Sequence, residues 1–169
     1  MAIIVEDGTI VPNANSYNSD ADYTAYAAAR GIAIGADAAA REIELIRATD
    51  YVDNELTRMQ SKTEPANQSL RYPQIGSYAN GVLVGKNTIP QELKRAQLEA
   101  AISVFKGDFD IVPTAKNIKS EQLANLKTEY FEGVNIEPKS QSADVYLDTL
   151  SPTASGTMFS GTMFSVVRG

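Results

Sequence analysis

Two long segments of the chain carry apolar residues at steps of three or four, the spacing that places side chains on one face of an α-helix. Between about Asp37 and Thr57 this stripe consists of Leu45, Ala48, Val52 and Leu56. Between Ile89 and Lys106 it consists of Leu93, Ala96, Ala100 and Val104, widened by Ile102 and Phe105. Asp37 is a predicted N-cap, and Pro90 suits the first turn of the second helix. The two stripes predict a mainly helical domain.

Two shorter helices are predicted beside this pair. Ser19 is a predicted N-cap with Asp22 three residues later, in the position of a capping box, and this helix runs to about Arg30 before Gly31. One of its faces carries small side chains that would let another backbone approach closely, namely Ala21, Ala25 and Ala28. A short helix over residues 143–150 is predicted to complete the domain.

Two β-hairpins are also predicted. Residues 3–6 and 9–11 flank Asp7-Gly8, a dipeptide typical of a tight type I′ turn. Residues 116–121 are predicted to pair with residues 126–131 in a second hairpin. The expected fold class is therefore mainly α, a small domain of three to four helices with one or two β-hairpins and an extended C-terminal tail.

The remaining segments are irregular in pattern. Residues 58–87 are punctuated by proline and glycine around one apolar patch at Val82-Leu83-Val84, which predicts a functional or interface loop. After Pro152, the sequence Ser-Gly-Thr-Met-Phe occurs twice in tandem, as residues 155–159 and 160–164. We therefore expect a domain over residues 1–150 and an extended docking tail over residues 151–169.

The tail is rich in glycine, serine and threonine, yet it carries large apolar side chains. They are Met158, Phe159, Met163, Phe164, Val166 and Val167. Apolar side chains on such a tail favour a partner that buries them, and extended tails dock by adding a strand to a sheet or by filling pockets. The alternative is a weakly sticky tail without a partner.

Composition excludes several kinds of chemistry. The 169 residues include no His, Cys or Trp, and 15 basic against 21 acidic residues give a formal charge of −6. Disulfides, thiolate nucleophiles, Cys/His zinc sites and Ser-His-Asp triads are therefore impossible. The acidic balance argues against a protein whose main task is to bind phosphate backbones. No window reaches the roughly 18 apolar residues of a membrane span, so we expect a soluble chain without a membrane partner.

One loop has a weak similarity to a phosphate-binding motif. Residues 81–87 place Lys86 after two glycines, but the spacer between the glycines has three residues where the motif needs four. Asn87 also stands where the motif has Ser or Thr. A loop with a glycine turn is the favoured interpretation.

Three carboxylate pairs are candidate cation ligands, namely Asp20/Asp22, Asp50/Asp53 and Asp108/Asp110. Asp50 and Asp53 lie three apart on one helical face, which suits a hard cation, but none of the pairs has the register of a calcium loop. Asp50 follows Ile43 and Ile46 along one strip. We interpret it as a partly buried carboxylate paired with an arginine, with Arg47 as one candidate.

A further cluster has the residue types of a single-strand stacking platform. It consists of Lys116, Lys119, Lys127 and Tyr130 on the second predicted hairpin. Acidic residues are interleaved with it, at positions 121, 129 and 132. A solvated strand face is the favoured interpretation.

Several segments, in this order and spacing, resemble the head–tail connector or adaptor (head-completion) proteins of tailed bacteriophages. Members of that family are often labelled putative DnaT-like single-stranded-DNA-binding proteins. The resemblance is carried by residues 5–9, 14–17, 26–31, 47–53 and 70–73, by Ile89-Pro90, and by Lys119-Ser-Glu121 followed by Glu129-Tyr130. These segments cover most of residues 1–150.

The resemblance implies a structural virion protein without catalysis or cofactor. It would form a homo-oligomeric ring, a dodecamer, in the neck beneath the portal, after assembly in the bacterial host cytoplasm. The ring would extend the channel through which double-stranded DNA passes without specific binding, and it would contact a stopper or tail-completion protein. The C-terminal segment would bind the portal through the apolar tail residues named above and Arg168.

Two other classes of function stay open at this point. One is a single-stranded-DNA-binding accessory protein that uses the lysines and tyrosine of the second hairpin. The other is a carboxylate-dependent metalloenzyme built on Asp50 and Asp53, which the absence of histidine makes the weaker of the two.

Overall fold

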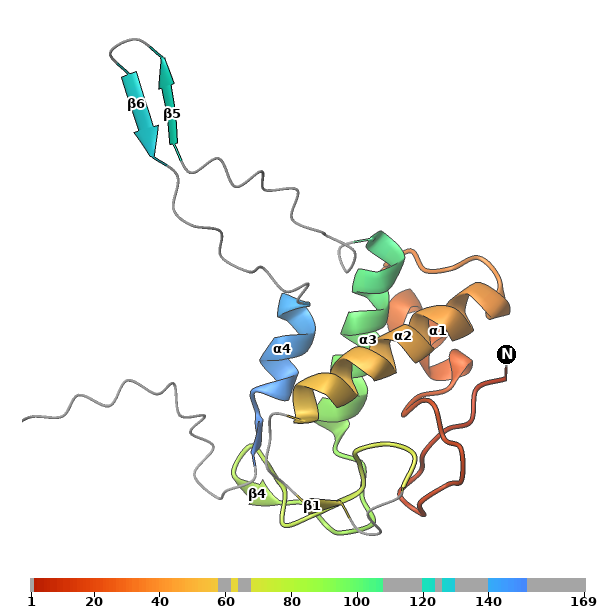
Figure 1. Cartoon of the computed structure of the whole chain (residues 1–169). Helices are drawn as coiled ribbons and strands as arrows, with labels where there is room; N and C mark the ends of the chain where they lie inside the picture. The colour runs from red at the N-terminus through yellow and green to blue at the C-terminus, as the bar shows by residue number, and fades with distance from the viewer. Residues whose placement is uncertain are drawn as a thin grey trace, which may run out of the picture.

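The structure is a computed structural model that describes residues 2–57, 62–63, 68–107, 120–123, 126–129 and 140–151. Four helices are its main elements (Figure 1). They are α1 (Asp20–Ala28), α2 (Ala38–Thr57), α3 (Gln91–Lys106) and α4 (Gln141–Leu147). The predicted mainly helical class is confirmed. Within the described ranges, no helix combines the length and apolar character that crossing a bilayer requires.

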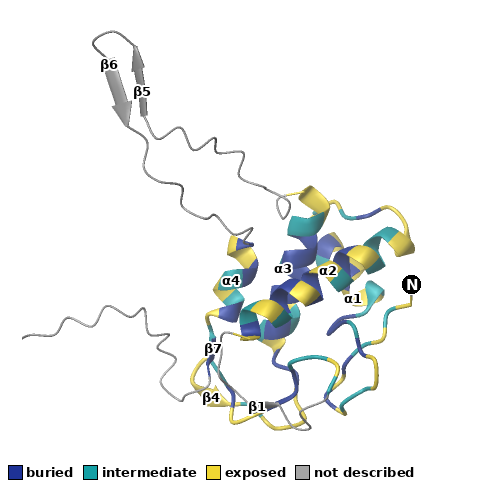
Figure 2. Ribbon diagram, viewed as in Figure 1, coloured by how far each residue is buried: buried dark blue, intermediate teal, exposed yellow. Residues whose placement is uncertain are grey.

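The core lies where α3 packs between α2 and α4. Figure 2 shows the facing sides of these helices as buried. The stripe predicted for α2 is completely buried, at Leu45, Ala48, Val52 and Leu56. The stripe of α3 is buried at Leu93, Ala96 and Ala100, whereas Phe105 at its end is exposed. Both long helices therefore bury the faces that their periodicity predicts.

The predicted helix boundaries hold closely for α2 and α3. Asp37 Oδ1 accepts a hydrogen bond of 2.7 Å from Ala40 N at the start of α2. Gly107 follows α3 in the left-handed conformation, at φ 76°, where a side chain would be strained. Helix α4 begins at Gln141, two residues before the predicted start, because Ser140 caps it.

Helix α1 packs with a different face from the alanine face singled out by its sequence. Tyr23 and Ala27 are its buried residues. The three alanines at positions 21, 25 and 28 are exposed. The large aromatic ring of Tyr23 buries more apolar area than an alanine face offers, which is why that side of the helix faces the core.

The strands are short, and seven of them occur among the described residues. They are β1 (Lys62–Thr63), β2 (Gln74–Ile75), β3 (Tyr78–Ala79), β4 (Val82–Leu83), β5 (Ser120–Leu123), β6 (Leu126–Glu129) and β7 (Leu150–Ser151). They form the pairs β1–β2 and β5–β6 and one three-stranded sheet in the order β4-β3-β7. Strand β3 is antiparallel to both of its neighbours, so β4 and β7 run parallel to each other at opposite edges.

The N-terminal hairpin predicted at Asp7-Gly8 does not form. Glu6 is buried, and its carboxylate accepts hydrogen bonds from the backbone N–H groups of Gly8 (2.8 Å), Ile10 (3.0 Å) and Val11 (2.8 Å). In the predicted ladder, Thr9 N and Val11 N would donate across to the facing strand. Thr9 N instead donates to Asp7 Oδ1 at 2.9 Å, and Val11 N donates to Glu6, so side chains compete successfully with strand pairing. The one bridge in this segment is parallel, between Val5 and Ser16.

A tight hairpin turn occurs instead at Asn80-Gly81, between β3 and β4. Both residues have positive φ, 50° and 77°, as a type I′ turn requires. The sequence contains the signal for this turn, an Asn-Gly dipeptide between short apolar runs.

The second predicted hairpin is present, and its first strand ends at Leu123, two residues beyond the predicted end, while residues 116–119 and 130–131 lie outside the described residues. Strands β5 and β6 pair in the register that joins Ser120 to Glu129 and Leu123 to Leu126. The tail residues from 152 onward lie outside the described residues.

Candidate interaction surfaces

Four tyrosine hydroxyls each donate a hydrogen bond to a carboxylate on another segment of the chain. The pairs are Tyr17–Asp53 (2.6 Å), Tyr23–Glu44 (2.9 Å), Tyr26–Glu99 (2.6 Å) and Tyr51–Asp144 (2.5 Å). Together they join the N-terminal segment and α1 to α2 and α3, and α2 to α4. Burial and the neighbouring carboxylate raise the pKa of each of these tyrosines. These hydroxyls therefore serve the fold and stay protonated.

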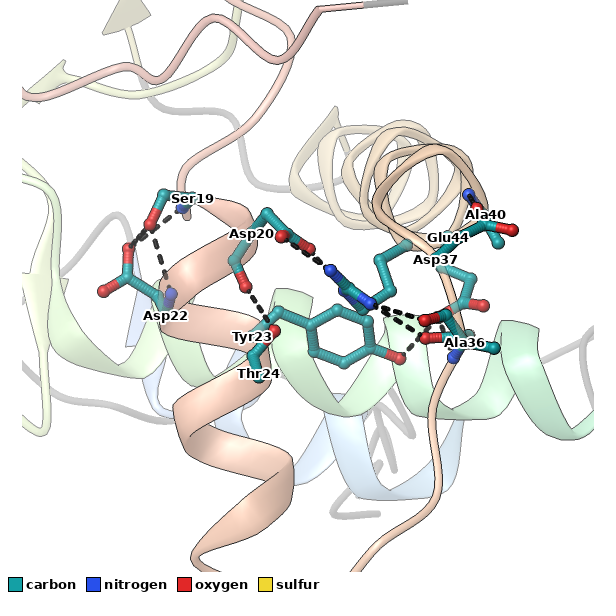
Figure 3. A network of polar contacts seen from close by, with 11 residues as sticks. Ser19, Asp20, Asp22, Tyr23, Thr24, Ala36, Asp37, Ala40 and Glu44 are labelled. Carbon is teal, nitrogen blue, oxygen red and sulfur yellow. Dashed lines mark hydrogen bonds and ion pairs between the residues drawn. The ribbon is translucent and has the colours of Figure 1, made fainter.

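Figure 3 shows the polar contacts between α1 and the start of α2. Arg41 donates two hydrogen bonds to Asp20, of 2.6 and 2.9 Å, and its guanidinium lowers the pKa of that carboxyl group. Arg41 also donates to the carbonyl oxygens of Gly35 (3.1 Å) and Ala36 (3.3 Å). Arg41 therefore binds both α1 and the connection between α1 and α2, and Asp20 serves as its ion-pair partner.

The capping box predicted at the start of α1 is present. The side chain of Ser19 accepts from Asp22 N at 3.1 Å, and Asp22 Oδ2 accepts from Ser19 N at 2.9 Å. The hydrogen bonds from Ser19 lower the pKa of Asp22. Asp22 therefore caps the helix, as its position in the sequence predicts.

The interpretation of Asp50 as a partly buried carboxylate is wrong. Asp50 and Arg47 both lie on the exposed face of α2. The half-buried carboxylate is Asp53, which accepts from the Tyr17 hydroxyl and, at 3.1 Å, from Arg71 N. Desolvation raises the pKa of Asp53 to about 6. Residues 17 and 71 come from distant segments, which a helical pattern alone does not reveal.

A buried glutamine connects the N-terminal segment to the helices. Gln97 Oε1 accepts from Tyr17 N (3.1 Å) and from Asn18 Nδ2 (2.8 Å). Its Nε2 donates to Ser16 Oγ (2.7 Å) and Thr49 Oγ1 (2.8 Å). No sequence signal pointed to this residue, because a polar side chain in an apolar stripe is ordinarily assigned to the surface.

The connection between α3 and α4 begins and ends at adjacent points. Ser103 Oγ near the end of α3 lies 2.8 Å from Ser140 Oγ before α4. Ser140 N donates to the Tyr51 hydroxyl at 3.2 Å, and that hydroxyl donates to Asp144. The two ends of the segment 108–139 are therefore held next to each other by these side chains of α2, α3 and α4 and by Ser140, and we call these contacts the closed base. We refer to this segment, which includes β5 and β6, as the arm.

The β4 edge of the three-stranded sheet exposes apolar side chains. Val82 and Leu83 are 70% and 60% exposed. Strand β4 pairs with β3 on one side, and no strand in the described ranges pairs with its other side. An open apolar edge is a surface on which another strand can add.

Several sequence-predicted residues lie outside the described side chains. They include the lysines and tyrosine of the nucleic-acid cluster (Lys116, Lys119, Lys127, Tyr130), the pair Asp108/Asp110, and the seven predicted portal-binding residues (Met158, Phe159, Met163, Phe164, Val166, Val167, Arg168). Among the side chains that the structure describes, no three His, Cys, Asp or Glu gather as metal ligands. The loop at residues 81–87 begins in the hairpin turn at Gly81.

Comparison with known proteins gives one match. A family model described as "Putative DnaT-like ssDNA binding protein" matches residues 1–169, the whole chain. No curated protein and no solved structure matches it.

Proposed function

The chain belongs to the family described as putative DnaT-like ssDNA-binding proteins, and from that premise we propose that it is a structural subunit of a bacteriophage neck. Copies form a ring beneath the portal in the virion. The ring extends the DNA channel and joins head to tail. It contacts the portal on one side and a stopper or tail-completion protein on the other. The subunit performs no catalysis and holds no cofactor.

The observation that carries this proposal is the closed base of the arm. The hydrogen bonds between Ser103, Ser140, Tyr51 and Asp144 hold the two ends of the arm together on the helical body. A segment whose two ends are fixed in this way is suited to contacts with other copies or with the stopper. The tail leaves the body at β7 and is available for the portal in the same way.

The charge distribution supports passage of DNA through such a ring. Among residues 1–57, ten are Asp or Glu, three are Arg and none is Lys. Like charges repel the phosphate backbone, and a surface that repels it allows DNA to move without being held. The segments that make up α1 and α2 are therefore suited to face a DNA channel.

The test is the copy number of this protein in purified virions, measured by quantitative peptide mass spectrometry against the portal protein. A ratio near one is expected for two stacked dodecameric rings. Absence of the protein from the particle would contradict the proposal.

The description of the family favours a second candidate function, single-stranded DNA binding. Four of the described tyrosines are engaged with carboxylates, so stacking would rely on the arm, which holds Lys116, Lys119, Lys127 and Tyr130. Titration of the full chain with labelled oligonucleotide at low and high salt separates the two functions. Binding that weakens steeply with salt, and that alanine at the three lysines removes, would favour this candidate.

A further inference from the structure

The open edge of β4 is an unusual apolar surface for this chain. Val82 and Leu83 are consecutive residues of an edge strand that no strand in the described ranges covers, so their exposed side chains lie on its two faces, and the N–H and C=O groups of Leu83 point away from β3. Proteins ordinarily protect such an edge with charge, proline or a covering segment. At β4, the hairpin turn at Asn80-Gly81 is fixed to the body by Asn80 N, which donates to Thr149 O at 2.9 Å, and by Asn80 Nδ2, which donates to Glu92 Oε1 at 2.8 Å. These two hydrogen bonds hold the β3–β4 hairpin, and with it the outer edge of β4, in place on the helical body.

The tail starts from the opposite edge of the same sheet. Strand β7 ends at Ser151, which lies level with Tyr78 and hence with Leu83 of β4. Three residues, 152–154, separate it from the first Ser-Gly-Thr-Met-Phe repeat. The tail, which carries a strand-length apolar segment, is therefore attached at the β7 edge. The β4 edge of the same sheet exposes the apolar side chains to which such a segment can add. Such a donor and acceptor on opposite sides generate a head-to-tail contact between copies, which closes into a ring when the rotation allows.

We infer that residues 155–159 of one copy add as a strand to the outer edge of β4 in the neighbouring copy. This inference rests on the ring of the proposed function and specifies how its copies are linked. Backbone hydrogen bonds supply the affinity, and Val82 and Leu83 pack against Thr157, Met158 and Phe159 of the incoming segment. The second repeat and the residues after it stay free to bind the portal.

The short linker favours a neighbouring copy over the tail's own sheet. The outer position beside β4 is three strand spacings from β7, or about 14 Å. The four Cα–Cα steps from Ser151 to Ser155 span roughly 13–14 Å when fully extended, so the linker reaches the outer edge of its own β4 only if it is stretched to its limit. The direct route is also blocked at this end of the sheet, because Val84 N donates to Ser77 O at 2.8 Å and prolongs the β3–β4 ladder. An abutting copy places its β4 edge next to the donor's β7.

Engineered cysteines test the contact, because the chain has none of its own. One variant carries Leu83→Cys. A second set carries a single cysteine, Thr157→Cys, Met158→Cys or Phe159→Cys, which covers the possible registers. The two proteins are mixed and oxidised, free in solution and together with purified portal protein. At least one pairing is expected to give a disulfide-linked mixed dimer, and the corresponding double variant a ladder of linked copies.

Val145→Cys is the matched control, because Val145 is a valine of similar exposure, 65%, on α4. It should yield at least tenfold less mixed dimer than Leu83→Cys. Adding Val82→Lys to the Leu83→Cys protein should lower the yield by a similar factor, since it places a charge at the acceptor edge. Linkage confined within single chains of the double variants, or no linkage above the control in either condition, would overturn the inference.

A truncation after Phe159 separates this inference from the proposed function. The shortened chain keeps the first repeat and lacks residues 160–169, so it should retain the mixed crosslink and lose portal binding. A crosslink that forms while the protein is absent from virions would leave the contact standing and reject the neck. If the protein is present in virions but its copies do not crosslink through β4, the neck function would stand and the β4 contact would be rejected.

Discussion

Single hydroxyl groups hold the N-terminal segment on the helical body. The Tyr17 side chain is completely buried, and its hydroxyl both donates to Asp53 and accepts from Tyr72 N at 3.2 Å. Removing the hydroxyl leaves a buried backbone donor and a half-buried carboxylate with one partner fewer. Unsatisfied groups of this kind cost more than the net value of the hydrogen bond itself.

We therefore expect Tyr17→Phe to lower the free energy of unfolding by about 1–3 kcal/mol, as measured by chemical denaturation. Tyr146→Phe is the control, because its half-buried hydroxyl makes no hydrogen bond with the described residues. That variant should change stability by less than about 0.5 kcal/mol. Equal effects of the two substitutions would show that the hydroxyl of Tyr17 has no special role.

The raised pKa of Asp53 makes the free energy of unfolding depend on pH in the opposite sense to that of a carboxylate whose pKa is lowered by folding. Burial raises this pKa to about 6 in the folded chain, whereas an unfolded aspartate titrates near its ordinary value of about 3.9. Between these values the folded state binds more protons than the unfolded state. This group therefore makes the free energy of unfolding increase as the pH falls from 7 toward 4.

Asp53→Asn should remove that increase, since the amide does not titrate. Denaturation at pH 7 and pH 5 measures the difference, and Asp148→Asn at the exposed position after α4 is the control. The capping and ion-paired carboxylates Asp20 and Asp22 have lowered pKa values, so they lose their contribution only at lower pH. A wild-type slope between pH 7 and 5 that Asp53→Asn leaves unchanged would contradict the assignment.

Sequence reasoning at this scale succeeded where the interaction is local. The capping box of Ser19 and Asp22 depends on residues three apart, and the pattern contains all of it. The choice between Asp50 and Asp53 depends on where residues 17 and 71 pack, and periodicity carries no information on that. Gln97 was missed for the same reason, because its partners lie in the N-terminal segment and in α2.

At the scale of elements, the long helices were predictable because their stripes and caps agree. The N-terminal hairpin was not, because Asp7-Gly8 carries a turn signal while the side chains of Asp7 and Glu6 accept from Thr9 N and Val11 N, the donors that its ladder needs. The real hairpin turn at Asn80-Gly81 has the same kind of signal, with no competing carboxylate in its flanks. A turn dipeptide is therefore informative only together with the side chains beside it.

The closed base of the arm leads to a prediction about α3 and α4. Replacing residues 108–139 with a short Gly-Ser linker should leave a cooperatively folded body with nearly unchanged thermal stability, measured by circular dichroism. In that background, Ser140→Ala should lower stability by about 1 kcal/mol, because Ser140 is the N-cap of α4 and the partner of Ser103. Loss of the cooperative transition on excising the arm would show that the body depends on it.

At the scale of the whole molecule, the boundary between body and tail follows the sheet. The predicted division at residue 150 cuts through β7, whose two residues, Leu150 and Ser151, are both buried. A body that ends at Ser151 keeps the three-stranded sheet intact.

Truncation after Ser151 should therefore preserve the melting temperature within about 2 °C, while truncation after Thr149 removes β7 and should lower it by several degrees. The Ser151 truncation should also abolish capture of the chain by immobilised portal protein. Capture equal to that of the full chain would reject the tail as the portal-binding segment. Unfolding of the Ser151 truncation would show instead that the tail belongs to the body.

The closed base of the arm also bears on how such a protein can diversify. A loop whose ends are held together by four side chains of the body can gain, lose or exchange residues at its tip without altering the folding of the helices. Under the proposed neck function, lineages that meet new stopper proteins would change the arm while Ser103, Ser140, Tyr51 and Asp144 are retained as a set. We expect sequence differences between relatives to concentrate in residues 108–139. The four side chains that hold the ends of this segment together should be conserved or replaced together.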